Sequence, residues 1–136
     1  MNGHNYLDAV DITPDEFYSA LATAETLPKT SSPSPQAAKE AMDALFAAGY
    51  QQIFGITISS AVSVTNNVFQ LAAQDFPADT VTILDTKSIG IGSGIQAAYA
   101  ASLINAGESF QDVIAKVRAS IVKSRIYFYV PTLKYL

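Results

Sequence analysis

Two segments near the start of the chain place apolar residues three to four positions apart, the spacing that lines one face of an α-helix. The first opens with Thr13–Glu16, a helix-start signature in which a threonine cap precedes a proline and a glutamate follows three residues after the cap. We expect this helix to end near Leu27. The second begins at the cap residue Ser34 and ends at Gly49, so the pattern predicts two helices joined by a loop rich in proline and serine.

Three short apolar runs follow, and each has the length and composition of a strand buried in a parallel sheet. Helical patterns separate the runs, which is typical of right-handed crossovers between parallel strands. The sequence therefore predicts an α/β fold, a three-layer domain with a short, mainly parallel sheet flanked by helices. Three strands are few for such a sheet, so one edge is left bare unless further strands come from elsewhere. The predicted strands are 52–58, 80–85 and 126–130.

The composition fits one domain with a sizeable core and excludes several kinds of function. The chain has 136 residues, of which 49% are hydrophobic and only 15% are charged, against about 25% in an average soluble protein. Twelve acidic and eight basic side chains give a net charge of −4, which argues against nucleic acid as a partner because phosphate binding needs clustered lysine and arginine. The absence of cysteine excludes disulfides, thiolate nucleophiles and cysteine metal sites.

The low charge raises the question of a membrane segment. The stretches 44–74 and 88–107 contain no charged residue, but polar residues and glycine interrupt both, so neither supplies the roughly 20 predominantly apolar residues of a span. Residues 1–11 lack the apolar core of a signal peptide. We therefore expect no membrane span and a cytoplasmic protein, part of whose uncharged surface is covered by something else.

Candidate chemistry lies where the first two predicted strands end, because ligands of open parallel sheets bind beyond the carboxyl ends of the strands. Ser59–Thr65 places four hydroxyl groups between a strand and a helix N-terminus, and Asp85–Ser88 follows the next strand. Hydroxyls and free backbone N–H groups at a helix N-terminus favour an anion, such as a carboxylate or a phosphate. The alternative is ordinary helix capping by one of these serines. Lys87 is equally well interpreted as an anion contact or as an exposed lysine.

Other motifs give little support for catalysis or for cofactor binding. Gly90–Gly94 lacks the lysine and the spacing of nucleotide-binding loops, and we interpret it as a place where a helix packs close to the sheet. His4 is the only histidine, and the sequence does not pair the acidic residues of 8–16 with a histidine or a carboxylate cluster elsewhere, so we expect no metal and no cofactor. A small hydrolase that uses Ser60 or Ser63 would need a general base nearby, which the sequence does not provide.

Four segments of the chain carry a recognisable combination of motifs. Pro28–Ser34 contains the run Lys-Thr-Ser-Ser-Pro-Ser, and Val10–Phe17 opens the first helix with Asp-Ile-Thr. Ile58–Thr65 contains Ser-Ser-Ala-Val-Ser-Val-Thr, and Ile83–Ser88 contains Asp-Thr-Lys-Ser. In this order and at this spacing, the segments resemble the motifs of the DegV family of bacterial fatty-acid-binding proteins, and the resemblance extends over essentially all of residues 1–136.

The resemblance implies a binding protein rather than an enzyme. In that family, two α/β domains enclose a long-chain fatty acid, hydroxyl groups hold its carboxylate, and a partner fatty-acid kinase phosphorylates it. Carried over to this chain, the resemblance implies that Thr30 and Ser63 bind the carboxylate. Possible additional contacts are Ser31, Ser59, Ser60 and Val64.

The chain departs from the family pattern in two ways. Val64 stands where the family has a glycine that would allow close backbone approach to the carboxylate, and Asn66 replaces an aromatic residue. Residues 1–136 also match only a partial N-terminal domain, without the family's first strand and C-terminal domain, an apparent truncation at both ends. We therefore expect weak or no fatty-acid retention by this chain alone. The alternative is a truncated, ligand-binding-deficient interaction module that self-associates as a homo-oligomer through its open sheet edge.

Overall fold

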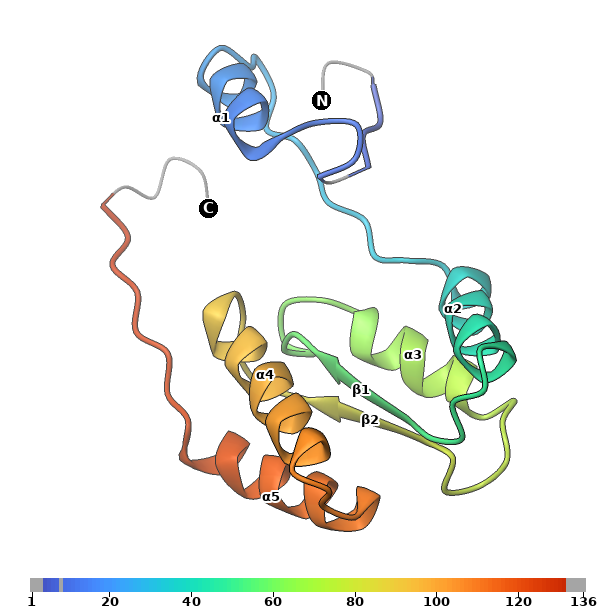
Figure 1. The fold of residues 1–136 in the computed structure, drawn as a ribbon. Helices are drawn as coiled ribbons and strands as arrows, with labels where there is room; N and C mark the ends of the chain where they lie inside the picture. The colour runs from blue at the N-terminus through green and yellow to red at the C-terminus, as the bar shows by residue number, and fades with distance from the viewer. Residues whose placement is uncertain (1–3, 8, 132–136) are drawn as a thin grey trace. The chain divides into compact units, whose positions relative to one another are not determined.

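The computed structural model describes residues 4–7 and 9–131, and the chain divides into two compact units. The first unit comprises residues 1–31 and 129–136, and the second comprises residues 32–128. The second unit holds both strands and all but one of the helices in the described part of the chain (Figure 1). In chain order the elements are α1 (Pro14–Ala22), α2 (Pro35–Ala47), β1 (Ile53–Thr57), α3 (Thr65–Ala73), β2 (Val81–Asp85), α4 (Ile91–Asn105) and α5 (Phe110–Lys123).

In the first unit, α1 begins where the sequence predicts. The Thr13 hydroxyl accepts a hydrogen bond from the Glu16 N–H at 3.3 Å, and the Glu16 carboxylate accepts one from the Thr13 N–H at 2.8 Å, which together form a capping box. The helix ends at Ala22, so the expected end near Leu27 is wrong. Because α1 buries none of its residues, no tertiary packing stabilises further turns of this short helix. Leu27 also precedes a proline, which disfavours helical backbone.

The second unit is built on two parallel strands, β1 and β2, which the crossover helix α3 connects. The strands pair in register, from Ile53 opposite Val81 to Thr57 opposite Asp85. Because the pairing has no offset, both strands end at the same level. The loops that follow them therefore begin at one edge of the sheet (Figure 1).

Helices cover both faces of this sheet and give the second unit three layers (Figure 1). Side chains of a strand alternate between the two faces, so each face has its own apolar core. One core joins α2 and α3 to the sheet, and the other joins α4 and α5 to it. This arrangement confirms the predicted α/β fold class. The buried residues are Ala38, Met42, Ile53, Ala72 and Ile83 in the first core, and Leu84, Ala100, Val113 and Val117 in the second.

The predicted third strand is wrong. Residues 126–130 form no strand, and β1 and β2 are the only strands among residues 4–7 and 9–131. Tyr127 is 90% exposed, and no neighbouring strand pairs with the backbone of this segment. Its aromatic and β-branched residues have strand propensity, but a strand forms only where a partner strand offers the complementary hydrogen bonds.

α4 carries no charged residue, a property that it shares with membrane-spanning helices. It has 15 residues, and its polar side chains Ser93 and Gln96 are buried. None of the helices that the structure describes combines the length and the apolar character needed to cross a membrane.

Candidate functional site

The loops that follow β1 and β2 are tied together by hydrogen bonds. The Ser59 N–H donates to the Ser88 carbonyl oxygen at 2.7 Å. The buried Thr86 hydroxyl donates to the Thr57 carbonyl oxygen at 2.9 Å, and its oxygen lies 2.8 Å from the Ser93 hydroxyl in the first turn of α4. These bonds join the two strand ends and α4 into one fixed edge, where ligands of parallel sheets bind.

Three hydroxyl side chains meet at this edge, and we call Ser32, Ser63 and Thr65 the hydroxyl cluster. The Ser63 oxygen lies 3.2 Å from the Ser32 hydroxyl oxygen and 2.8 Å from the Thr65 hydroxyl oxygen. It also accepts a hydrogen bond from the Thr65 N–H at 3.2 Å. Ser63 is half-buried, so its neighbours fix its position while solvent still reaches it.

The hydroxyl cluster lies at the N-terminus of α3, where the helix dipole favours an anion. Val64 is the cap residue and makes no side-chain hydrogen bond to the helix. The backbone N–H groups of Asn66 and Asn67 donate to no acceptor within the described part of the chain. The buried Asn66 side chain donates to the Thr57 hydroxyl at 2.9 Å and so anchors the first turn of α3 to the end of β1. The first turn of α3 therefore has two backbone N–H donors available, and the hydrogen bond between Asn66 and Thr57 fixes its position.

Asp85, Lys87 and Ser60 form a charged cluster at the same edge. The Lys87 ammonium lies 2.6 Å from the Asp85 carboxylate and 3.4 Å from the Ser60 hydroxyl. The backbone N–H groups of Ser60 and Lys87 donate to that carboxylate at 3.3 Å and 2.8 Å. Burial alone would raise the pKa of Asp85, but hydrogen bonds from Lys87 and Ser60 outweigh burial and lower the pKa from 3.8 to about 2.

Protonation of Asp85 is expected to destabilise the second unit. Because its pKa in the folded protein lies below 3.8, the carboxylate contributes stability above its ordinary pKa and loses that contribution as the pH falls from about 4 to about 2. Asp85→Asn removes the charge, and we expect it to lower the free energy of unfolding at neutral pH by roughly 1–3 kcal/mol. Thermal unfolding of both proteins at neutral pH and near pH 2 measures this. A difference of equal size at the two pH values contradicts the prediction.

The structure places the residues that the sequence marks for carboxylate binding in different environments. Ser63 is central to the hydroxyl cluster, whereas Ser60 belongs to the charged cluster. Ser59 is buried, and its hydroxyl accepts a backbone hydrogen bond of its own turn at 3.2 Å, so it shapes the loop. Thr30 and Ser31 are exposed residues of the first unit, and their contact with a carboxylate stays a prediction.

The sequence analysis missed Ser32 and assigned no separate role to Thr65. Ser32 belongs to a run of hydroxyl residues in which the family resemblance favours Thr30 and Ser31. The abundance of hydroxyls in two loops is a signal for a cluster. Which serine reaches Ser63 depends on the path of the chain before α2, and that path follows from packing.

Two glycines shape the start of α4. A Cβ on Gly92 would lie 2.1 Å from the Ser88 hydroxyl oxygen, so any larger residue would displace Ser88 or α4. Gly90 has φ +52°, in the left-handed region that favours glycine. A Cβ on Gly94 would meet no atom within 4 Å. Gly92 therefore allows a close approach to the loop after β2 and not to a strand, so the predicted close packing of these glycines on the sheet is wrong.

Comparison with known proteins identifies the family of this chain. The family model described as "Uncharacterised protein, DegV family" matches residues 1–136. The chain belongs to the DegV family. A curated DegV domain-containing protein of Clostridium acetobutylicum is 33% identical over 131 residues. The match covers 96% of this DegV chain and 46% of the relative, so the chain spans about half the length of that relative.

Solved DegV structures have the same fold. A DegV family protein from Thermus thermophilus, described for its fatty acid binding, is 31% identical with a TM-score of 0.79, over 88% of this chain and 42% of that one. A fatty acid binding DegV family protein from Streptococcus agalactiae is 27% identical with a TM-score of 0.82, over 90% of this chain and 43% of that one. The family resemblance that the sequence motifs carry is thereby confirmed.

Proposed function

We propose that this DegV domain binds the carboxylate of a long-chain fatty acid at the hydroxyl cluster and presents it to a partner fatty-acid kinase. The observation that carries the proposal is the meeting of three hydroxyls with the open N-terminus of α3. A carboxylate only accepts hydrogen bonds, and hydroxyls together with the N–H groups of Asn66 and Asn67 are donors that suit it. The helix dipole adds a favourable field for its negative charge.

Exposed apolar side chains near the hydroxyl cluster suit the first part of an acyl chain. Val64 and Leu71 are seven residues apart, so two turns of helix bring them to the same face of α3. Val62 belongs to the loop that carries Ser63. All three apolar side chains are more than half exposed, and a neighbouring group of this kind is typical of a surface that a ligand covers.

Two relatives support fatty-acid binding. The DegV proteins from Thermus thermophilus and Streptococcus agalactiae are each described as binding fatty acid, and they are 31% and 27% identical to this chain. Presentation to a kinase rests on the family resemblance alone and is the finer part of the proposal. Because this chain covers 42% and 43% of those two proteins, we do not extend the proposal to full enclosure of the ligand.

Binding explains the site better than hydrolysis does. The basic group at the Ser60 hydroxyl is Lys87, and its ammonium is ion-paired with Asp85. An ammonium has no lone pair with which to accept a proton, so it does not activate Ser60 as a nucleophile. Within the described residues, the hydrogen-bond partners of the Ser63 hydroxyl are the Ser32 hydroxyl, the Thr65 hydroxyl and the Thr65 N–H, and none of these is a general base. Among the described residues, no group of three or more histidine, aspartate or glutamate side chains is placed to hold a metal ion.

Calorimetric titration of the delipidated 136-residue chain with decanoate tests the proposal. We expect weak, saturable binding at one site. Decanol has the same tail without the carboxylate, and we expect it to bind at least about tenfold more weakly because it forms no charge-assisted hydrogen bond. Equal affinity for the two compounds contradicts carboxylate recognition. Native mass spectrometry of the purified chain adds a check, since a tightly held stoichiometric acyl ligand on the monomer would contradict weak retention.

Val64→Gly is expected to strengthen decanoate binding. Val64 has φ −79°, an ordinary right-handed conformation, so valine causes no backbone strain, but its side chain stands at the open end of α3. Glycine is tolerated at a helix cap and lets the carboxylate approach the backbone more closely. We expect an affinity gain of about threefold, measured by the same titration. Unchanged or weaker binding contradicts this reason for the low affinity.

A second candidate function is self-association without a ligand. The segment Tyr127–Tyr129 favours it, because its aromatic side chains are 70–90% exposed and its backbone pairs with no described strand. Sedimentation velocity over a range of concentrations separates the two candidates. A concentration-dependent dimer that does not bind decanoate favours self-association, whereas a monomer that binds decanoate rules it out as the main function.

A further inference from the structure

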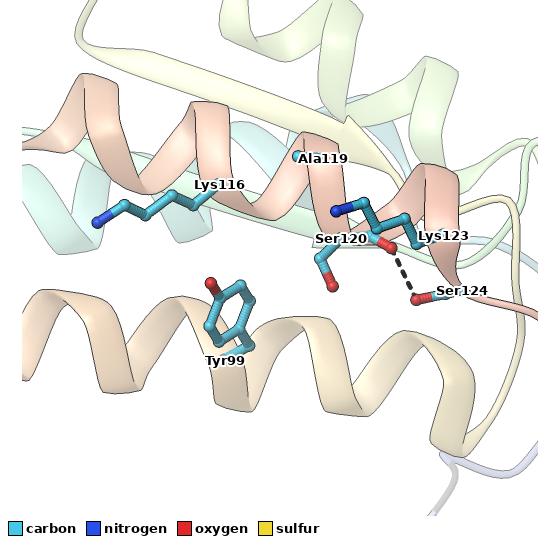
Figure 2. A pocket seen from close by; sticks show the side chains of 6 residues that line it. All are labelled: Tyr99, Lys116, Ala119, Ser120, Lys123 and Ser124. Carbon is cyan, nitrogen blue, oxygen red and sulfur yellow. Dashed lines mark hydrogen bonds between the residues drawn. The ribbon is translucent and has the colours of Figure 1, made fainter.

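A cavity of about 370 Å³ lies between α4 and α5 and includes none of the residues of the hydroxyl cluster (Figure 2). Its volume falls at the lower end of the range for small-molecule sites. It therefore suits a small metabolite or the headgroup of a larger molecule. The residues that line it are Tyr99 from α4, and Lys116, Ala119, Ser120, Lys123 and Ser124 from α5 and the residue that follows it.

The side of the cavity that α5 supplies is basic in an otherwise acidic chain. Four of the eight lysine and arginine residues lie within Lys116–Arg125, although the net charge of the chain is −4. Lys116 and Lys123 are seven residues apart, so two turns of helix bring both to the cavity. Asp112 is the only acidic residue of α5. The local charge therefore attracts anions.

Three donors at the cavity are uncommitted. Each lacks a hydrogen-bond or ion-pair partner in the part of the chain that the structure describes. They are the Lys123 ammonium, the Tyr99 hydroxyl and the Ser120 hydroxyl. Figure 2 shows the Tyr99 ring rising from α4 towards α5 and the Ser120 hydroxyl turned towards α4. Lys116 instead extends towards the N-terminal end of α5 and is ion-paired with Glu108.

A buried amide holds one of the residues that line the cavity, Ser124, in position. The Ser124 hydroxyl donates to the Ser120 carbonyl oxygen at 2.9 Å and accepts a hydrogen bond from the Gln96 side-chain N–H at 2.8 Å. Gln96 is 2% exposed, and its side-chain oxygen has no hydrogen-bond donor within residues 4–7 and 9–131. The Gln96 oxygen is therefore a buried acceptor without a donor, which costs free energy.

We propose that this cavity binds a phosphoryl group, carried by a soluble phosphate ester or by a lipid headgroup. A phosphoryl group has several charged oxygens around a tetrahedral centre, so Lys123, Tyr99 and Ser120 can each bind a different oxygen from two helices. A carboxylate has two oxygens in one plane and makes less use of donors spread in this way.

Calorimetric titration of the 136-residue chain with glycerol 3-phosphate at low ionic strength tests the proposal. We expect one saturable site, and we expect Lys123→Gln to weaken it at least about fivefold through the loss of a charge-assisted hydrogen bond. Arg118→Gln is the matched control, because it removes the same charge from the same helix at a residue that does not line the cavity. Equal weakening by the two variants overturns the proposal.

Two further probes identify the source of the phosphoryl group. If the chain binds vesicles of phosphatidylglycerol through Lys123 but does not bind glycerol 3-phosphate, the ligand is a lipid headgroup. Binding of glycerol 3-phosphate without vesicle binding assigns the cavity to a soluble ester. Acetate is the selectivity control, and an acetate affinity equal to that of glycerol 3-phosphate overturns the phosphoryl assignment. Failure to bind both the ester and the vesicles overturns it as well.

Discussion

Ser63→Ala is expected to weaken decanoate binding by about tenfold, because the variant removes the hydroxyl at the centre of the proposed site. Ser63 contacts both other members of the hydroxyl cluster, at 3.2 Å for Ser32 and 2.8 Å for Thr65. Its loss therefore removes one donor to the carboxylate and releases two more from their positions. The Thr65 N–H also loses its acceptor at 3.2 Å, so a small loss of stability accompanies the loss of affinity.

Control variants separate the binding role of Ser63 from a structural one. Ser102→Ala removes an exposed hydroxyl of α4 that donates to the Tyr99 carbonyl oxygen at 2.7 Å, and we expect it to leave decanoate affinity unchanged within about twofold. Ser63→Thr keeps a hydroxyl and should retain more affinity than Ser63→Ala. If a folded Ser63→Ala variant keeps the wild-type affinity, the hydroxyl cluster is not the carboxylate site.

Met42→Ala is expected to lower the free energy of unfolding by about 2–5 kcal/mol. Met42 is 2% exposed and is one of the largest fully buried side chains of the described structure. It belongs to the core in which α2 packs against α3 and the sheet, so alanine leaves a cavity between them. α2 follows Ser32 by a few residues, and loosening the helix is also expected to loosen Ser32 from Ser63.

Two variants on the same helix test this explanation. Met42→Leu nearly conserves the volume and should cost less than about 1.5 kcal/mol. Leu45→Ala changes a side chain that is 41% exposed, and we expect a clearly smaller cost than for Met42→Ala. Chemical denaturation of the three variants gives the comparison. Similar losses for Met42→Ala and Leu45→Ala would show that α2 does not pack on the sheet through Met42.

Most elements of the second unit follow from signals that act over a few residues. The Ser34 hydroxyl accepts a hydrogen bond from the Ala37 N–H at 3.1 Å, as its capping position predicts. The apolar runs that contain 53–57 and 81–85 become the two paired strands. The run 126–130 has similar propensity, yet it forms no strand. Pairing needs a second strand, and no local pattern specifies whether one is present.

The edge that carries the site was predictable, whereas its contacts were not. Parallel strands deliver their loops to one edge, so the hydroxyls of 59–65 were expected there. Ser32 and Ser63 are 31 positions apart in the sequence, and their meeting depends on how α2 packs. Asn66 stands out in the motifs only as a departure from the family, but the structure buries it in a hydrogen bond to Thr57.

Amide chemical shifts of the isotope-labelled chain during titration with decanoate test the proposed carboxylate site most directly. The proposal predicts saturable shifts of the Thr65, Asn66 and Asn67 N–H resonances with decanoate. It also predicts much smaller shifts of the same resonances with decanol, and much smaller shifts with decanoate in Ser63→Ala. If these three amides respond equally to decanoate and decanol, or if decanoate shifts only resonances elsewhere in the chain, the N-terminus of α3 does not bind the carboxylate.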